Sequence, residues 1–474
     1  MAIKTIDAAL MGAKTASELD YIVGVNTAGE KVKVGRNDLV RMLGESLVDY
    51  YGVRIDLTSD SADLTRVGNP ALHASLPVQS LMRRCLLNDA GQVTAYLHPT
   101  DSNKTDTGAA ANLTGAAGQV MVEIPRHWRK VETEANAVTV LISATEQPGF
   151  EEIPRMFRSA YQAVVDRTDA KAPKLASVVN ATAAFRGGNN NADYDGTAKS
   201  FLGMPSTAVS LTNFRTYARA RGAAGKNNAG WNCDVYDAQL AVYWLFVIEY
   251  ATLNCQKAYN AELTAEGYRQ GGLGDGVSTL NWNNWSKFNG NCPVVKCGLT
   301  NTLGNASGVV EYTLPAEFDT TKTVKVGVPS YRGMENPFGQ IYTFADGCKI
   351  EMQSDAAGGK SKFYVCSDPA KFQDKDATGY EYRGDLARKK GFISKLLLGT
   401  HGDNVAAATD GAYNTYYCDY YEAGNLPTTG TEWRAVMFGG DASAGSAAGL
   451  AYSRSSIAAG GADAYIGSRL CFLP

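Results

Sequence analysis

The C-terminal segment, residues 433–472, constrains the fold of this chain more than any other part of it. The segment begins and ends with apolar side chains, among them Trp433, Phe438, Ile466 and Leu470. Between these ends is a run of Gly, Ala, Ser, Tyr, Asp and Arg that has no apolar stripe at helical spacing. Such a composition usually marks a low-complexity linker. A linker, however, has no reason to precede an apolar end that must pack somewhere, so we expect this segment to belong to a folded domain.

The larger or charged side chains of this segment fall on alternate positions. They form three sets: Asp441 and Ser443; Tyr452, Arg454 and Ser456; and Asp463 and Tyr465. Alternate side chains of an extended strand point to the same face, so each set is expected on one face. We therefore expect these side chains to be exposed and clustered. Apolar side chains are expected to be buried beneath them: Trp433, Phe438, Leu450, Ile466 and Leu470.

The residue types that are missing from this segment are also informative. From Phe438 to the end of the sequence there is no Lys, Glu, Gln, Met or Trp. Together these five types make up roughly a fifth of average protein composition, so chance is a poor explanation for their absence. The residues at the alternating positions can all be reached from an AAC asparagine codon by changing only its two adenines.

This pattern, closed by the sequence Ile466-Gly467-Ser468-Arg469, resembles the variable region of the target proteins of diversity-generating retroelements. In that family an error-prone reverse transcriptase rewrites template adenines, so that asparagine codons become a restricted, stop-free set. The resemblance extends over about residues 65–474 and is carried by further stretches: residues 80–93, 118–130, 244–263, 267–276 and 331–339, and Trp433-Arg434 with Gly439-Gly440.

The resemblance implies a fold and a set of ligand-binding positions. The implied fold is α+β, a C-type-lectin-like domain related to formylglycine-generating enzymes, with long insertions over residues 61–474. Residues 433–472 are its diversified variable region. The implied ligand-binding residues lie within that region: Asp441, Ser443, Ala444, Ala447, Tyr452, Arg454, Ser456, Ile457, Gly461, Asp463 and Tyr465.

The resemblance also implies a function. Proteins of this kind are receptor-binding tail proteins, or adhesins, of phages, and their variable surface binds a host cell-surface receptor that is a protein or a glycan. The chain would then be part of the virion. A paratope of Tyr, Ser, Asp and Arg on a Gly/Ala scaffold suits this role, because Tyr offers a large contact area and Arg anchors the ligand.

Composition and charge exclude several other classes. The chain has 474 residues, which suggests two or three domains, and 45% of them are hydrophobic. Its formal net charge is -3 and it has no long basic run, so nucleic acid is not an expected partner. Residues 1–20 contain no signal-peptide pattern, and the longest apolar run, residues 241–248, is too short to span a bilayer. We expect synthesis in the bacterial cytoplasm and no membrane insertion.

Residues 1–60 are expected to form a separate N-terminal unit. Residues 19–34 read as two strands around a turn that contains Asn26 and Gly29. A helix capped by Asn37 or Asp38 would follow, with one apolar face: Leu39, Val40, Leu43, Leu47 and Val48. The unit resembles the N-terminal segments of phage tail fibres, which attach to other tail proteins or trimerise. A small adaptor domain is the alternative, and a homotrimer is the expected assembly.

The region between these two parts reads as a mixture of strands and helices. Strands are expected at residues 93–97, 120–124 and 138–143, and loops at 101–118 and 185–195. Helices are expected at residues 151–166, with Pro154 in the first turn, and at 235 to about 263. Short strands and turns are expected over 282–348. Glu249, the lone carboxylate in the apolar half of the second helix, is expected to be paired.

No pattern in the sequence predicts a cofactor, a metal or an active site. The nine cysteines are dispersed, which favours reduced and buried thiols. Cys292 and Cys297 have no nearby pair or histidine to complete a zinc site. The four histidines, at positions 73, 98, 127 and 401, are far apart, and the known catalytic motifs are missing. A binding protein is therefore expected rather than an enzyme.

Two enzymatic alternatives remain. The first is an oxidase of the formylglycine-generating type that acts on a Cys-containing peptide, because Cys471 follows closely behind Arg469 as a catalytic cysteine does in that family. Its spacing is displaced, and Cys418 is the one plausible partner thiol. The second is a glycan-hydrolysing tailspike, which would require repeats and paired carboxylates that the sequence does not display.

Overall fold

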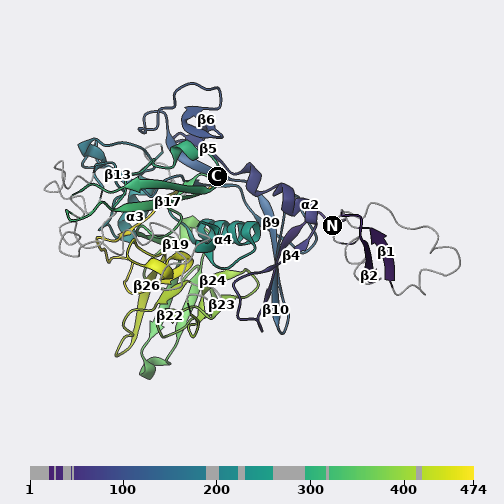
Figure 1. Cartoon of the computed structure of the whole chain (residues 1–474). Helices are drawn as coiled ribbons and strands as arrows, with labels where there is room; N and C mark the ends of the chain where they lie inside the picture. The colour runs from purple at the N-terminus through teal and green to yellow at the C-terminus, as the bar shows by residue number, and fades with distance from the viewer. Residues whose placement is uncertain are drawn as a thin grey trace.

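The computed structural model of the chain describes residues 21–25, 28–35, 44, 47–187, 202–222, 230–259, 294–316, 320–412 and 419–474. About 40% of these residues lie in strands and 14% in helices. The protein is a β-rich body of the sandwich or half-barrel kind (Figure 1). The predicted α+β, C-type-lectin-like fold related to formylglycine-generating enzymes is therefore wrong. Strand pairing between distant segments decides this architecture, and local sequence patterns reflect such pairing poorly.

One sheet of seven strands includes the C-terminal end of the sequence. In spatial order its strands are β15 (Trp231–Cys233), β29 (Leu470–Phe472), β12 (Met156–Ser159), β8 (Gln119–Ile124), β5 (Arg83–Leu87), β6 (Val93–His98) and β7 (Asp101–Thr105). β29 is antiparallel to both of its neighbours, and Cys471 lies opposite Asn232 on one side and Arg158 on the other. The apolar C-terminal end is thus packed inside a sheet, as its sequence predicts.

A second sheet, of eight strands, carries the predicted variable region. Along its main path lie β21 (Glu381–Asp385), β20 (Ser361–Val365), β19 (Tyr342–Gln353), β26 (Thr431–Gly439), β27 (Gly449–Arg454), β25 (Tyr420–Glu422) and β22 (Gly391–Phe392). β28 (Ile466–Gly467) pairs in parallel with β19. β27 is held on both sides, antiparallel to β26 and parallel to β25. Residues 441–465 therefore start and end at strands of this sheet.

The remaining strands form smaller sheets. A five-stranded sheet has the order β11 (Glu151–Ile153), β9 (His127–Thr133), β10 (Ala137–Ser143), β3 (Tyr51–Asp56) and β4 (Thr65–Gly68). Smaller groups are β13 (Val164–Asp166) with β14 (Lys174–Ala176), β23 (Lys395–Leu398) with β24 (Asp403–Ala408), and β16 (Gly308–Thr313) with β17 (Lys325–Tyr331) and β18 (Met334–Glu335). The expected strands at 93–97, 120–124 and 138–143 are confirmed as β6, β8 and β10. The expected loop at 101–118 begins instead with strand β7.

The described helices are few. The α-helices are α2 (Pro70–Ser75), α3 (Leu211–Arg219) and α4 (Tyr236–Tyr250). The single-turn 3-10 helices are η3 (Gln79–Leu81), η4 (Ala183–Phe185), η6 (Cys255–Ala258), η8 (Asn301–Leu303), η9 (Asp355–Ala357), η10 (Pro369–Lys371) and η11 (Gly445–Ala447). None of the helices that the structure describes combines the length and the apolar character needed to cross a membrane.

α4 lies at the centre of the molecule, among the sheets (Figure 1). Twelve of its fifteen residues are buried, which agrees with a sequence that is apolar on nearly all sides. The helix ends earlier than predicted, because Ala251 adopts a left-handed conformation with φ of 51° and its N–H donates to the carbonyl of Val247. Asn254 then begins the separate turn η6 by accepting hydrogen bonds from the next two free N–H groups. Residues 260–263 lie outside the described residues.

The carboxylate of Glu249 is paired, as its position in α4 predicts. Arg332 Nη2 lies 2.5 Å from Glu249 Oε1, and the Tyr331 hydroxyl donates to Oε2 at 3.1 Å. Tyr331 is the last residue of β17 and Arg332 lies in the turn that follows, and both meet the helix near its C-terminal end. Glu249 therefore helps to attach α4 to the three-stranded sheet that contains β17.

The helix predicted at residues 151–166 is absent, and three strands occupy its place. β11 pairs with β9, β12 pairs with both β8 and β29, and β13 pairs with β14. Pro154, which was expected in a first helical turn, lies between β11 and β12. The apolar spacing of this stretch suits a helix, but the hydrogen bonds available from the neighbouring strands decide its conformation.

The N-terminal unit is described only in part. β1 (Tyr21–Val25) and β2 (Lys31–Gly35) form the predicted hairpin, with Gly29 at φ of 84° in the turn, while Asn26 lies outside the described residues. The expected helix is mostly outside the described residues as well; Leu47 and Val48 are not helical, and Leu47 is 84% exposed. In Figure 1 the hairpin lies to one side of the main body. β3, at residues 51–56, already belongs to that body through its pairing with β10 and β4.

A buried ion pair joins the two strands that flank the C-terminal strand. Arg158, on β12, donates from Nε and Nη2 to the two carboxylate oxygens of Asp234 at 2.8 and 2.5 Å, and both side chains are buried. Asp234 Oδ1 also accepts a hydrogen bond from the Cys471 thiol of β29 at 3.3 Å. The pair thus lies beside the strand that closes the seven-stranded sheet.

We predict that Arg158→Ala will lower the free energy of unfolding by about 3–5 kcal/mol, because it leaves the buried Asp234 carboxylate without its counter-ion. Chemical denaturation measures this change. Arg54→Ala is the matched control, since Arg54 forms an exposed ion pair with Glu134 and its loss should have a much smaller effect. Equal destabilisation by the two substitutions would contradict a special role for the buried pair.

Candidate functional site: a tyrosine-lined pocket

The C-terminal segment forms a pocket on the eight-stranded sheet. The cavity has a volume of about 360 Å³ and nine lining residues: Tyr342, Tyr420, Asp441, Ser443, Ala444, Ala447, Tyr452, Arg454 and Tyr465. Seven of the nine belong to the ligand-binding positions that the resemblance implies. Five of the seven alternating residues are among them, and they come from β27 and from the connections before and after it.

The other four predicted positions do not line the cavity. They are Ser456, Ile457, Gly461 and Asp463. Ser456 supports the pocket from behind, because its hydroxyl accepts a hydrogen bond from Arg454 Nε at 2.7 Å. Asp463 Oδ1 accepts from the backbone N–H of Ala464, just before Tyr465. These residues shape the wall of the pocket or its surroundings rather than its inner surface.

The expectation that the whole alternating set is exposed is wrong for six of its seven residues: Ser443 is exposed, two residues are buried and the other four are partly buried. Asp441 is 6% exposed and Tyr452 is 5% exposed, whereas Ser443 is exposed and Arg454 and Tyr465 are partly buried. The reason is that β27 has a neighbouring strand on each side, so the Tyr452 ring packs between other aromatic rings. The alternating set therefore includes both the floor and the rim of a hollow, and not a flat display surface.

The apolar residues expected beneath the set are mostly where the sequence places them. Phe438, Leu450, Ile466 and Leu470 are each at most 3% exposed. Trp433 differs, because it is only partly buried. Trp433 lies near the start of β26, at the end of this strand away from the pocket. Its ring packs against that of Tyr364, with 5.6 Å between the ring centroids. Trp433 thus covers the outer strands of the sheet and is not part of the core under the pocket.

Four tyrosines make a connected aromatic wall. The Tyr342 hydroxyl donates to the Tyr452 hydroxyl at 2.8 Å, and their ring centroids are 5.3 Å apart. Tyr420 stacks on Tyr452 at 5.9 Å with an interplanar angle of 29°, and Tyr465 meets Tyr342 edge-on at 5.8 Å. Aromatic pairs at these separations attract one another beyond the simple burial of area. The wall therefore offers ring faces in fixed orientations.

Arg454 lies across this wall. Its guanidinium carbon is 5.1 Å from the ring centre of Tyr342 and 5.0 Å from that of Tyr465, which is favourable for a cation–π interaction. Arg454 Nη2 also donates to the Tyr465 hydroxyl at 3.0 Å, and Nε donates to Ser456. These contacts hold the guanidinium in one place at the edge of the cavity, where an anchoring cation is useful for binding.

Asp441 supplies the negative charge of the pocket. Its Oδ1 accepts hydrogen bonds from the backbone N–H and the hydroxyl of Ser443, at 3.0 and 2.8 Å. Burial raises the pKa of the Asp441 carboxyl above its ordinary value, and the bonds from Ser443 oppose this rise. The pocket thus combines a carboxylate, a guanidinium, hydroxyls and ring faces, a set that can bind a polar ligand with an apolar side.

Two of the pocket residues could not be identified from the C-terminal segment. Tyr342 lies on β19 and Tyr420 on β25, and both belong to the framework of the sheet. A signal for Tyr420 was present in the tyrosine-rich run of residues 413–421, of which 413–418 lie outside the described residues. Tyr342 carries no such signal, because its place in the pocket depends on the pairing of β19 with β26 and β28.

A buried aspartate supports the pocket from below. Asp419 Oδ2 accepts a hydrogen bond from the backbone N–H of Ala451 at 2.7 Å, and burial raises the pKa of its carboxyl well above the ordinary value. Gly449 leaves the space that this carboxylate occupies: a Cβ on Gly449 would lie 1.9 Å from Asp419 Oδ1. A side chain at position 449 is therefore incompatible with the present position of Asp419.

The surroundings of Cys471 bear on the alternative of a formylglycine-generating type of oxidase. Cys471 is completely buried, and burial raises the pKa of its thiol well above the ordinary value. Cys418 lies outside the described residues. Within the ranges that the structure describes, no group of three or more His, Cys, Asp or Glu side chains is placed to hold a metal ion.

Comparisons with known proteins do not assign this chain to a family. The chain matches no protein-family model and no curated protein. Its function must therefore be inferred from its residues and their arrangement.

We predict that Gly449→Ala will destabilise the protein by about 1–3 kcal/mol, because the new methyl group displaces the Asp419 carboxylate and the strands around it. Thermal unfolding measures this effect. Gly460→Ala is the control: no atom lies within 4 Å of a Cβ at that position, so its melting temperature should match that of the parent. A Gly449→Ala variant as stable as the parent would show that position 449 tolerates side chains.

Proposed function

We propose that this chain is a phage receptor-binding tail protein and that its C-terminal pocket binds a host cell-surface ligand, a protein or a glycan. We further propose that it is a target protein of a diversity-generating retroelement. One observation carries both statements: seven of the nine residues that line the pocket are positions that the resemblance implies for ligand binding, and five of these seven belong to the alternating set with the codon pattern. A diversification system that changes these positions would change the ligand-contacting surface and leave most of the chain unaltered.

The different origins of the framework residues and the variable residues of the pocket support this proposal. Tyr342 and Tyr420 come from the framework and would give every variant the same two aromatic walls. Ser443, Arg454 and Tyr465 are exposed or partly buried, so their replacement should affect stability little and recognition strongly. Aromatic and arginine side chains commonly provide most of the binding energy of an interface. The pocket therefore has the chemistry of an adaptable binding site.

The proposed assembly follows from the same role. The part of the chain before β3 would attach it to other tail proteins of the virion, and the chain would act as a homotrimer. Several copies on one particle turn weak single contacts into strong attachment through avidity. Light scattering of the intact protein tests this assembly, and a stable monomer would contradict it.

We predict that the double variant Arg454→Ala/Tyr465→Ala will bind host cells far more weakly than the parent, because it removes a central arginine and a central aromatic ring. Each such truncation typically costs about 2 kcal/mol or more of binding free energy. Adsorption of the purified protein to host cells measures the loss.

The matched control is Arg388→Ala/Tyr382→Ala, which removes the same residue types from another part of the chain. Tyr382 is 48% exposed on β21, and Arg388 pairs with Asp355. Neither residue lines the pocket. Melting temperatures verify that both variants are folded. Unchanged adsorption of a folded Arg454→Ala/Tyr465→Ala variant would remove the pocket from consideration as the receptor site.

The diversification part of the proposal has a separate test. A genome that encodes this chain should carry a reverse transcriptase gene beside a near-copy of the sequence for residues 433–472. In that copy, adenines should replace other bases at the codons of the pocket positions. A near-copy whose differences lie elsewhere would refute the retroelement assignment, while the receptor-binding assignment would still depend on the adsorption experiment.

A further inference from the structure

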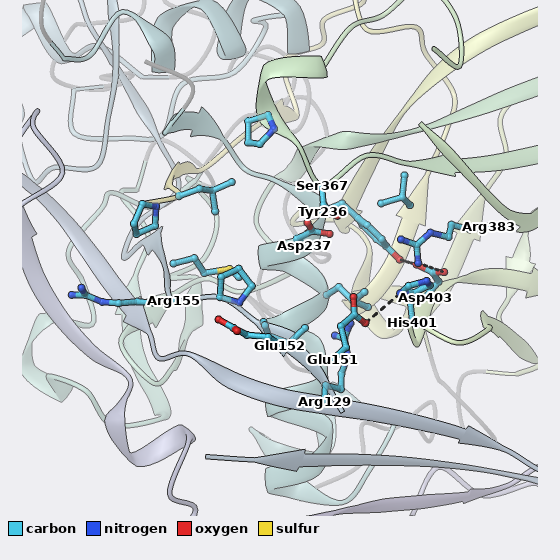
Figure 2. A pocket seen from close by; sticks show the side chains of 18 residues that line it. Arg129, Glu151, Glu152, Arg155, Tyr236, Asp237, Ser367, Arg383, His401 and Asp403 are labelled. Carbon is cyan, nitrogen blue, oxygen red and sulfur yellow. Dashed lines mark hydrogen bonds and ion pairs between the residues drawn. The ribbon is translucent and has the colours of Figure 1, made fainter. Parts of the chain in front are cut away.

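A second cavity, of about 330 Å³, shares no lining residue with the tyrosine pocket. It lies among β9, the β11–β12 connection, the first turn of α4, β21 and the start of β24 (Figure 2). Part of its wall is apolar and includes five side chains: Ile153, Met156, Leu240, Val365 and Leu473. The rest of the wall carries charged groups. None of the predicted variable positions contributes to it.

Most charged groups on one side of this cavity already have partners. Glu151 Oε2 lies 3.3 Å from His401 Nδ1, and the Tyr236 hydroxyl donates to Asp403 Oδ1 at 3.0 Å. Asp403 Oδ2 is 4.0 Å from Arg383 Nη1. Figure 2 shows these groups gathered together at one side of the cavity. In this wall Arg383 faces Asp403, and His401 carries a charge opposite to that of Glu151 only when its imidazole is protonated.

Arg129 and Asp237 are different. Arg129, on β9, is 6% exposed, yet its guanidinium makes no hydrogen bond and no ion pair with any residue that the structure describes. Asp237, in the first turn of α4, is partly buried, and the nearby Ser367 side chain partly offsets the effect of burial on its pKa. Burial lowers the pKa of Arg129 and raises that of Asp237. The nearby carboxylates of Glu151 and Asp237 oppose the fall at Arg129, but no hydrogen bond or ion pair joins either of them to its guanidinium.

The Arg129 side chain is largely buried and has no hydrogen-bond acceptor among the residues that the structure describes, so its N–H donors depend on water or on a ligand in the cavity. Arg129 lines the cavity, so a molecule inside it can accept these bonds. A planar guanidinium matches a carboxylate best, since two parallel N–H groups meet two oxygens. Asp237 lines the same cavity and can accept hydrogen bonds from an ammonium group.

We propose that this cavity binds a small zwitterion of the amino-acid type. Its carboxylate binds Arg129, its ammonium group binds Asp237, and an aliphatic side group packs on the apolar wall. A volume of about 330 Å³ falls within the usual range of small-molecule sites, about 300–1,000 Å³. This site is independent of the receptor-binding function proposed for the tyrosine pocket.

The surrounding charges favour a ligand that is neutral overall. A simple anion would bind Arg129 but would also be repelled by Glu151 and Asp403, which line the cavity too. A simple cation would bind Asp237 but would meet Arg129 and Arg383. A zwitterion places each of its charges beside the opposite charge of the protein and adds no net charge to a partly buried site.

Isothermal titration calorimetry of the full-length protein with L-leucine tests the proposal. The comparison ligands are 4-methylpentanoate, which has the same aliphatic group and carboxylate but no ammonium, and 3-methylbutylamine, which has no carboxylate. We expect saturable binding of L-leucine and binding about tenfold weaker or more for each comparison ligand, because each loses one charge-assisted contact. No measurable binding of L-leucine, or equal binding of all three ligands, would overturn the proposal.

Variants of the two charged residues locate the site. Arg129→Gln and Asp237→Asn should each weaken L-leucine binding about tenfold or more. Arg155→Gln is the matched control, because Arg155 lines the same cavity but its Nε already bonds to Glu123 at 2.7 Å, so binding should change little. Folded Arg129→Gln and Asp237→Asn proteins that bind L-leucine like the parent would refute the assignment. If either variant fails to fold, the three-ligand series on the parent protein still decides the matter.

Discussion

The insertion of β29 between β15 and β12 is the constraint on which the rest of the structure depends. Three residues near the end of the sequence complete a seven-stranded sheet by hydrogen-bonding on both sides. Just before them, Arg469 is completely buried and donates to three backbone carbonyls, those of Ser159, Glu335 and Asn336. Together with β26 at its other end, this arrangement clamps residues 441–465 at both termini. The residues in the middle of a segment held in this way can be substituted while its two ends stay fixed in the sheets.

Positions of this clamped segment that line the tyrosine pocket differ in how freely their residues can be substituted. Tyr452 and Asp441 are buried, so a replacement at either position must also satisfy the neighbouring side chains. Ser443 and Tyr465 are more accessible, and many side chains fit at such positions. Asp419 and Gly449, which lie below the pocket, leave no space for variation between them. Buried positions thus preserve the shape of the hollow, while accessible positions determine what its rim presents to a ligand.

The sequence predicts the pocket better than it predicts the fold. The sequence of residues 441–465 identifies seven of the nine lining residues: five from the alternating set, and Ala444 and Ala447 from the family resemblance. The fold class depends on pairings such as β12 with β29, which join residues far apart in the sequence and leave no local pattern. For the same reason a helix was expected where β11 to β13 lie. Arg129 and Asp237 were also missed, since only the tertiary structure brings β9 and α4 to one cavity.

Under the diversification proposed above, the position of β29 has a consequence for truncated variants. Any chain cut short within the variable segment by a frameshift lacks this strand, so the edges of β12 and β15 remain without their common partner. Unpaired edges expose hydrogen-bonding groups and promote aggregation and degradation. A chain truncated in this way is therefore expected to misfold. If the chain is diversified as proposed, only products that contain β29 would display an altered pocket.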